Sequence, residues 1–514
     1  MNRVKFLFFI VICFFAIQIA NAQTPTWVDI SSIIYKNCTQ CHSDGGIAPF
    51  SLVGYNNCKN MASSIASSTQ SKRMPPWPAD PKYRRYAHER VLSANEIDQL
   101  KKWADNDAPY GDTTIKIADP TSNNGTQLKN ISLMLKMPNY TVNTSNDEYR
   151  CFVLPTNLTQ NQFATALEVI PGNRSIVHHV LVFQDTSSIP TAKDLADPNP
   201  GYLAYGGTGS PTSQLIGIYV PGQEPMVFPA GFGTKILKNT KIILQVHYPK
   251  GISNQLDSTK VALKLTTSNL REVYIASILN HNNNNMTNGP LYIPADQKKT
   301  FYTKYVVGGK ATVFACAPHM HLIGQKIKAY GLNANGDTTK IINIPNWDFH
   351  WQRTYSFYRP LIINAGLTLW GEAYYNNTAS NLLNPNLPPL AVSKGESTTD
   401  EMMLVYFWYT GYQSGDENIV MDSMPLKNLS SIINPIKNSV NIAPIPANQN
   451  LQFSSNLGIN KITLFSLEGQ KVIEYQLDNQ KNGSINCQYQ PDGMYILELK
   501  SDKTVTRKKI LIAH

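Results

Sequence analysis

The ten histidines of this 514-residue chain are unevenly distributed, and five of them lie in three short apolar stretches. These stretches are Val177-His178-His179-Val180, Gln245-Val246-His247-Tyr248 and Pro318-His319-Met320-His321. Their composition is typical of strands. A methionine-bearing stretch, Asp400-Glu401-Met402-Met403, follows at a similar interval. Imidazoles held on strands, together with one thioether, suit copper far better than calcium or magnesium.

Length and composition indicate several domains rich in β-structure. A chain of this length is too long for a single core. Charged residues make up only 16%, and Asn, Thr, Ser, Tyr, Pro and Gly are plentiful, which is typical of extracellular β-rich domains. The formal net charge is +10, but no basic stripe carries interleaved aromatics. This argues against a nucleic-acid partner.

The N-terminus predicts export. Arg3 and Lys5 form a positive region, residues 6–19 are apolar, and Ala20-Asn21-Ala22 is a cleavage site of the A-x-A type. We therefore expect residues 1–22 to be a signal peptide. The apolar stretch is short for a bilayer and no other segment qualifies, so no integral membrane span is expected.

Residues 27–112 are expected to form a small helical domain. Ser93 and Glu96 make a capping box at the start of its closing helix. Ahead of it lies Cys38-Thr39-Gln40-Cys41-His42, the pattern of c-type haem attachment. In that pattern the two thiols form thioethers to the porphyrin and the histidine is an axial ligand. A redox-active or zinc-binding CxxC is the alternative, which the adjacent histidine and the export signal disfavour.

The second axial ligand is predicted to be Met74, which stands in a rigid Pro-rich stretch. Met61 is the rival. A methionine opposite a histidine raises the haem potential and favours electron transfer. The unit resembles class I cytochrome c domains across residues 30–110, so one covalently attached haem c is expected.

His319 and His321 stand at i and i+2, which places both imidazoles on the same face of a strand. Met402 is the candidate third ligand, and such a site leaves a position open for dioxygen. The alternative for Met402 is simple core packing. His178 and His179 would face opposite sides of a regular strand, so one shared metal requires a bend, a bulge or the use of Nδ1.

His247 would complete a three-histidine site with that pair. The alternative is that one of the adjacent histidines is buried and the other exposed. The recurrence of histidine-bearing strands at similar intervals favours the metal site.

On these motifs, residues 131–425 resemble the copper type II, ascorbate-dependent monooxygenases, the family of peptidylglycine α-hydroxylating monooxygenase and dopamine β-monooxygenase. The resemblance implies two jelly-roll-like β-sandwiches, 131–270 and 271–425, with one copper on each, in a multidomain and mainly β chain. It implies an electron-storing copper and a copper that activates O2 and hydroxylates a C–H bond. The implied ligands are His178, His179 and His247 for the first copper, and His319, His321 and Met402, as the catalytic residues, for the second.

The sequence departs from the peptide-processing branch of that family. Ala317 stands where that branch has an arginine that helps to hold a substrate carboxylate, and Leu404 stands where it has an asparagine. Tyr406 keeps the following aromatic residue. A peptidylglycine substrate is therefore not expected, and the substrate, small or peptide-like, is undetermined. Five further aromatic residues are candidates for the pocket, although core packing explains them equally well: Trp347, His350, Trp351, Tyr374 and Tyr375.

Hydroxylation with O2 needs two electrons, which animal relatives take from ascorbate. Here a tethered haem precedes the copper domains. We expect it to pass electrons singly to the His178/His179/His247 copper, the external donor being an ascorbate-like reductant or a redox protein.

Residues 433–514 are expected to form a separate small β-sandwich. They resemble the C-terminal sorting domain of bacterial type IX secretion substrates in Ala443-Pro444-Ile445-Pro446-Ala447, in 464–470, in Asp492-Gly493-Met494-Tyr495 and in the basic 507–512. The resemblance implies export from a Gram-negative bacterium, through the periplasm, with the type IX machinery as partner. A carbohydrate-binding or adhesive domain is the alternative.

Outside the haem pattern, the mature cysteines are far apart in sequence. A Cys151–Cys316 disulfide is possible in an oxidising compartment. Two rivals to the oxygenase remain open: a haem and copper electron carrier, and a surface copper-binding or adhesive protein. A blue-copper carrier would need a cysteine ligand beside two histidines, and no cysteine here has that setting.

Overall fold

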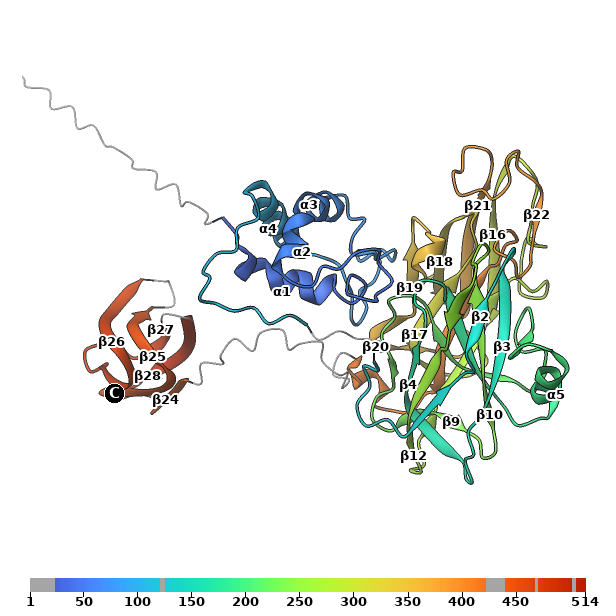
Figure 1. The fold of residues 1–514 in the computed structure, drawn as a ribbon. Coiled ribbons are helices and arrows are strands. Elements are labelled where there is room, and N and C mark those ends of the chain that lie inside the picture. Colours follow the sequence, from blue (N-terminus) through green and yellow to red (C-terminus); the bar gives the residue numbers. More distant parts are fainter. Residues whose placement is uncertain (1–23, 121–124, 422–439, 467–469, 502–504) are drawn as a thin grey trace, which may run out of the picture. The chain divides into compact units, whose positions relative to one another are not determined.

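The computed structural model describes residues 24–120, 125–421, 440–466, 470–501 and 505–514, so the expected signal peptide lies outside the described residues. The chain divides into two compact units, Met1–Ser430 and Ser431–His514 (Figure 1). Strands account for 42% and helices for 11%, which confirms the expected mainly β class.

The N-terminal part of the first unit is helical. Its helices are α1 (Trp27–Asn37), α2 (Tyr55–Asn60), α3 (Ala62–Gln70) and α4 (Ala94–Asp105). The capping box expected at Ser93 is present, with Ser93 Oγ accepting from Glu96 N–H. Trp27 and Trp103 are buried with ring centroids 6.1 Å apart, and they join α1 to α4.

The first β-region is built from two large sheets that pack face to face, with a small third sheet in which β2 pairs with β11. Its elements are β1 (Leu133–Lys136), β2 (Tyr140–Val142), β3 (Glu148–Pro155), β4 (Gln162–Ile170), β5 (His179–Asp185), α5 (Ile189–Ala196), β6 (Tyr202–Leu203), β7 (Gln214–Tyr219), β8 (Met226–Val227), β9 (Phe232–Ile236), β10 (Lys241–Tyr248), β11 (Gln255–Asp257), β12 (Lys260–Thr266) and β13 (Arg271–Glu272). One sheet has the order β1-β12-β4-β9-β13, with β8 also on β4, and the other has the order β6-β3-β10-β5-β7. Buried side chains from both sheets, such as Leu167 on β4 and Val246 on β10, share one core.

The second β-region repeats this arrangement. Its elements are β14 (Tyr274–Asn280), β15 (Tyr292–Ile293), β16 (Gln297–Val306), β17 (Ala311–His319), β18 (Gly324–Leu332), β19 (Thr338–Ile344), the 3-10 turn η1 (Phe349–Trp351), β20 (Tyr355–Ile363), β21 (Thr368–Asn377), β22 (Val392–Ser393), β23 (Leu404–Gly411) and the 3-10 turn η2 (Asp416–Asn418). The sheets have the orders β14-β23-β17-β20 and β16-β21-β18-β19, and β15 pairs with β22. Their facing sides share one core, with Val405 on β23 and Ile327 on β18 among its members.

The segment between α3 and α4 leaves the helical part and packs onto the second β-region. Tyr86 is 5% exposed, forms an antiparallel bridge with Phe357 on β20, and donates its hydroxyl to Ile341 O (2.7 Å). Asp80 N–H and Ala87 N–H donate to the carbonyls of Asn343 and Ser356, both at 2.9 Å. A buried tyrosine with a satisfied hydroxyl fixes this segment on the sheet.

The second unit is a sheet of five strands. They are β24 (Val440–Ala443), β25 (Asn450–Phe465), β26 (Lys471–Asn486), β27 (Gly493–Lys500) and β28 (Val505–Ile512). The order is β24-β25-β27-β28, with β26 also on β25. Alternate residues of β25, β27 and β28, such as Leu464, Leu497 and Ile510, are buried in its own core.

The possible Cys151–Cys316 disulfide is not formed. Both thiols are free and fully buried, Cys151 on β3 of the first β-region and Cys316 on β17 of the second. Each is enclosed by the core beside its own sheet, where it packs as a small apolar group.

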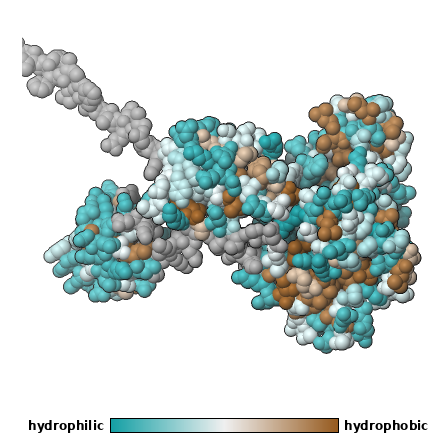
Figure 2. Space-filling view, viewed as in Figure 1, coloured by the Kyte–Doolittle hydropathy of each residue, from teal (hydrophilic) through white to brown (hydrophobic). Residues whose placement is uncertain are grey.

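Hydrophobic surface gathers at the end of the second β-region near β21 and β22 (Figure 2). The loop between these strands exposes Leu382, Leu387 and Leu390, by 96%, 82% and 58%. Among the described helices, none has both the length and the apolar character needed to cross a bilayer.

Candidate metal centre

Three imidazoles of the first β-region point their Nδ1 atoms toward one another. The Nδ1 atoms of His178 and His179 are 3.2 Å apart, and Nδ1 of His247 is 3.2 Å from the first and 3.4 Å from the second. The centre of a triangle with these sides lies about 1.9 Å from each nitrogen, close to a metal–imidazole bond of about 2.0 Å. The three nitrogens therefore fit one metal ion, and these residues form a candidate metal cluster.

The strand order explains how adjacent histidines reach one point. His179 is the first residue of β5 and stands opposite His247 on β10. His178 precedes the strand and donates its N–H to the His247 carbonyl (3.0 Å), so the alternation of strand side chains does not apply to it. Both rings turn Nδ1 inward, one of the possibilities that the sequence left open.

The two adjacent rings are kept neutral. Desolvation, reinforced by the neighbouring imidazoles, lowers the pKa of His178 to about 3 and lowers the pKa of His179 well below its ordinary value. Neutral imidazole is the form that binds metals, so these rings are ready for a metal at neutral pH.

In His319 and His321 of the second β-region, hydrogen bonds at Nδ1 leave Nε2 as the nitrogen that can bind a metal. Nδ1 of His319 lies 2.5 Å from Gln352 Oε1, and Nδ1 of His321 lies 3.1 Å from the Asp400 carbonyl. Because both partners are acceptors, each Nδ1 carries the proton and each Nε2 is left with its lone pair. Burial lowers the pKa of His319 to about 4 and that of His321 well below its ordinary value.

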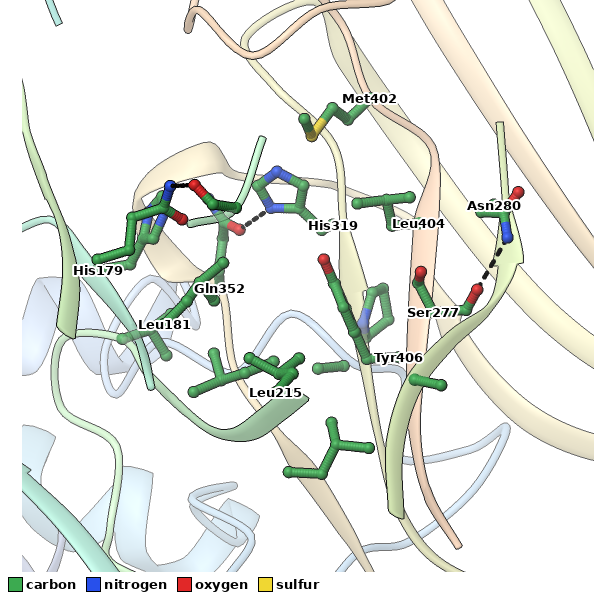
Figure 3. Close-up of a pocket in the computed structure, with 18 of the residues that line it drawn as sticks. His179, Leu181, Leu215, Ser277, Asn280, His319, Gln352, Met402, Leu404 and Tyr406 are labelled. Atoms are coloured by element: carbon green, nitrogen blue, oxygen red, sulfur yellow. Dashed lines mark hydrogen bonds between the residues drawn. The ribbon is translucent and has the colours of Figure 1, made fainter. Parts of the chain in front are cut away.

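Met402 lies at the same cavity, and its thioether points toward the His319 ring (Figure 3). Its backbone is tied to the histidine pair through Glu401, whose buried carboxylate accepts from the N–H groups of His321 (2.9 Å) and Met402 (3.2 Å). Two more N–H groups, of Ile323 and Gly324, donate to the same carboxylate. Two imidazoles and a thioether are a donor set that favours cuprous copper.

The two donor sets face each other closely. The ring centroids of His179 and His319 are 6.4 Å apart. Phe349 from η1 stacks on His178 with centroids 4.7 Å apart, and its edge meets His321 at 5.8 Å. The structure therefore brings together all six residues that the sequence proposed as copper ligands.

The cavity lined by His179 of the first set and by His319, His321 and Met402 of the second has a volume of about 530 Å³. Its walls combine polar and apolar side chains from both β-regions, and Figure 3 shows Leu181, Leu215 and Leu404 among the apolar ones. Ala317 and Leu404 line it, at the two positions where polar residues of the peptide-processing branch are missing. Burial raises the pKa of the lining Tyr406 to about 12, so its hydroxyl stays protonated as a hydrogen-bond donor.

The other aromatic residues that the sequence suggested for the pocket do not line this cavity. Trp347 and Tyr375 are buried behind the site, where they donate to the carbonyls of His321 (3.2 Å) and Met402 (2.7 Å). His350 is exposed and pairs with Asp348. Packing and support of the backbone therefore explain Trp347 and Tyr375.

The CxxCH motif follows α1 directly. Cys38 and Cys41 are free thiols, and burial raises the pKa of Cys38 to about 12. Nδ1 of His42 lies 3.2 Å from the Phe50 carbonyl, so that Nε2 keeps its lone pair. Free thiols and an oriented imidazole fit haem attachment. Met74 lies in the turn after α3, where its N–H donates to Ser68 O (3.1 Å), and its axial role stays a prediction.

Sequence reasoning gave no role to the residues that hold the ligands. Asp147 lies 3.5 Å from His247 Nε2 and accepts from Thr398 of the second β-region. Gln352 orients His319, and no local pattern marks either residue. Glu401 had a local signal, because it directly precedes Met402.

Comparison with known families agrees with two parts of the chain. Residues 292–432 match the family model of the copper type II ascorbate-dependent monooxygenase C-terminal domain, and the range contains His319, His321 and Met402. Residues 434–513 match the secretion system C-terminal sorting domain. No curated protein matches the chain.

Solved structures give only weak likenesses. The BSP domain of a biofilm-associated protein is 9% identical over 79% of this chain and 84% of that one, with a TM-score of 0.15. The VP2 subviral particle of infectious bursal disease virus is 9% identical over 59% and 86%, with a TM-score of 0.14. Scores this low carry no argument.

The sorting domain indicates export through type IX secretion, to the surface or the surroundings of a Gram-negative cell. In its family matches, the chain is thus similar to copper type II monooxygenases in residues 292–432 and carries a secretion sorting domain in residues 434–513.

Proposed function

We propose that this protein is an exported copper-dependent monooxygenase that hydroxylates a C–H bond of a small or peptide-like substrate with O2. One observation carries the proposal. Three Nδ1 atoms converge on one β-region, and His179 of that cluster lines the same cavity as His319, His321 and Met402 of the other β-region. His178, His179 and His247 would hold the first copper, and His319, His321 and Met402 the second. Bound copper would supply one-electron storage at the first site and reduction of O2 at the second.

The chain's own residues prepare this chemistry. Gln352 and the Asp400 carbonyl keep the Nδ1 protons of His319 and His321 in place, so that both rings present Nε2. Glu401 holds the backbone of His321 next to that of Met402. Leu181, Leu215 and Leu404 would offer apolar contacts to the substrate inside the cavity.

The overall reaction consumes one O2, two electrons and two protons for each C–H bond. One oxygen atom enters the substrate as a hydroxyl group and the other leaves as water. The cavity offers Ala317 and Leu404 where a carboxylate clamp would stand, which favours a substrate without a carboxylate beside the reacting carbon.

We propose further that Cys38, Cys41, His42 and Met74 hold a haem c that supplies the electrons one at a time. The position of the motif supports this. Gly45 and Gly46, just after the motif, line one surface cavity with residues 171–175, the loop that leads to His178. Electrons entering here would meet the first copper set before the second.

The decisive experiment begins with metal and haem content of the purified protein. We expect two copper ions and one covalent haem per chain, and O2 uptake that depends on reductant and substrate. Two coppers with no O2 uptake under any reductant would favour the electron carrier. Tight copper binding with no product and no effect of Met402→Ile would favour a copper-binding surface protein.

A further inference from the structure

The loop between β21 and β22, residues 378–391, presents a group of leucines to the solvent. Leu382 and Leu387 are 96% and 82% exposed, and Leu390 is 58% exposed. Leu383, beside the first of them, is 41% exposed. Residues 378–393 contain no charged side chain. This loop belongs to the hydrophobic surface at the end of the second β-region (Figure 2). Apolar side chains gathered in this way mark a surface that another molecule covers.

Hydrogen bonds from asparagines hold the loop in this conformation. Nδ2 of the fully buried Asn377 donates to the Leu390 carbonyl (2.7 Å), and Nδ2 of Asn384 donates to Asn377 Oδ1 (2.9 Å). Nδ2 of Asn381 donates to the Asn376 carbonyl (2.9 Å). Three prolines restrict the backbone further: Pro385, Pro388 and Pro389. The leucines are therefore presented in a fixed arrangement, and little conformational entropy is lost when a partner covers them.

Lysines lie around the base of the loop. In the sheet, β16 and β18 flank β21, the strand from which the loop departs. Lys298 and Lys299 on β16, and Lys326 on β18, stand opposite residues 374–376 near the end of β21. The exposed Asp296 just before β16 is the acidic residue beside them, so positive charge is in excess here.

The shape of the apolar group favours a lipid surface over a protein partner. Leu382 and Leu387 are so exposed that they protrude as single side chains. A rigid protein would need a matching pocket for each of them, whereas the fluid interface of a bilayer closes around any small apolar group. Lysines behind an apolar tip also complement negatively charged headgroups. The sorting domain indicates export to the surface or the surroundings of a Gram-negative cell, where the outer membrane offers such a surface.

We propose that the 378–391 loop docks the protein on an anionic bilayer, with its leucines seated at the level of the headgroups and acyl chains. Lys298, Lys299 and Lys326 would then meet the negative charge of the lipid. The docking is reversible, because a few leucines bury far less apolar surface than a spanning helix does. This inference does not depend on copper or on haem.

The test is co-sedimentation of the mature protein with vesicles of phosphatidylcholine and phosphatidylglycerol in equal parts. The double variant Leu382→Ser/Leu387→Ser should lower the vesicle partition coefficient at least about tenfold, because two leucines lose their burial in the lipid. Its thermal unfolding should match that of the wild type, since both side chains are exposed in the fold. Leu195→Ser, at an 83% exposed leucine on α5, is the matched control and should bind like the wild type.

A second pair of variants tests the lysines. Lys298→Gln/Lys326→Gln should weaken binding to these vesicles by about fivefold for each lysine, and should leave binding to pure phosphatidylcholine vesicles unchanged. Lys129→Gln/Lys238→Gln removes the same charge at two exposed positions outside the second β-region and should have little effect.

The other outcomes overturn the proposal. If the wild type does not bind the vesicles, the loop is not a docking element for lipid. Vesicle binding that the leucine changes leave intact shows that the basic chain adsorbs by charge alone. A wild-type dimer in sedimentation velocity that the double leucine variant abolishes, without vesicle binding, identifies a second copy of the chain as the occupant.

Discussion

The carboxylate of Asp147 lies 3.5 Å from Nε2 of His247, the ring nitrogen opposite the one that joins the three-imidazole cluster. The same carboxylate accepts from Thr398 N–H (3.0 Å) on the loop that leads to Met402. Burial opposes its ionisation, but the nearby His247 imidazole and the hydrogen bonds from Thr398 outweigh burial and lower the pKa of Asp147. One side chain therefore orients a ligand of the first site and anchors the loop of the second.

We expect Asp147→Asn to weaken copper at the first site by about 10–100-fold, the usual effect of removing a partner that orients a ligand histidine. A competitive chelator titration of the two coppers measures this. Asp337→Asn, in the exposed β18–β19 turn, is the control. Equal weakening by both variants would contradict an orienting role for Asp147.

Gln352→Leu should weaken the second copper by a similar factor, about 10–100-fold, because Nδ1 of His319 loses its acceptor. The first copper should be unaffected. Gln325→Leu is the matched control, since the Gln325 side-chain amide donates only to a backbone carbonyl. A loss confined to the first copper would refute the assignment of His319 to the second site.

Met402→Ile should remove sulfur from the coordination shell of cuprous copper, and X-ray absorption at the copper edge reports it directly. The neighbouring Met403 is 1% exposed and belongs to the core of the second β-region. Met403→Ile should therefore lower stability by about 1 kcal/mol and leave the copper–sulfur signal intact. An unchanged signal in Met402→Ile would show that Met402 is a core residue and not a ligand.

The ionisation of Asp416 makes the stability of the fold depend on pH in the acid range. The residue is 4% exposed and accepts from Arg271 at 2.6 and 2.9 Å. Burial raises its pKa, but the hydrogen bonds from Arg271 and Thr312 outweigh burial and lower it to about 2. Because the folded-state pKa lies below the ordinary one, its contribution is complete above about pH 4 and is lost as the pH falls toward 2.

Asp416→Asn should therefore cost about 3 kcal/mol at pH 7, since it leaves Arg271 without its charge partner, and less near pH 2. Chemical denaturation between pH 2 and pH 7 measures the difference. A cost that does not change with pH would contradict the assignment.

The sequence predicted the ligand-bearing strands because strand residues follow local rules. His319 and His321 both line the cavity as expected, although β17 ends at His319 and His321 lies just beyond the strand. Ser93 caps its helix through a residue three positions away. The adjacent pair was harder, since the convergence of His178 and His179 depends on where β5 begins.

The contacts that support the ligands could not be predicted from local patterns, because they depend on side chains from distant segments. Gln352 reaches His319 across 33 residues and Asp147 reaches Thr398 across 251. The burial of Tyr86 in the second β-region was equally hidden, because the segment around it reads as part of the helical domain.

Phe349 links the two β-regions. Its ring is stacked on a histidine of one β-region and meets a histidine of the other edge-on. Separating the two β-regions would break these ring contacts and expose a phenyl group that is now 6% exposed. The contacts of Phe349 therefore oppose a separation of the two donor sets, by about 0.5–1.5 kcal/mol for each ring pair.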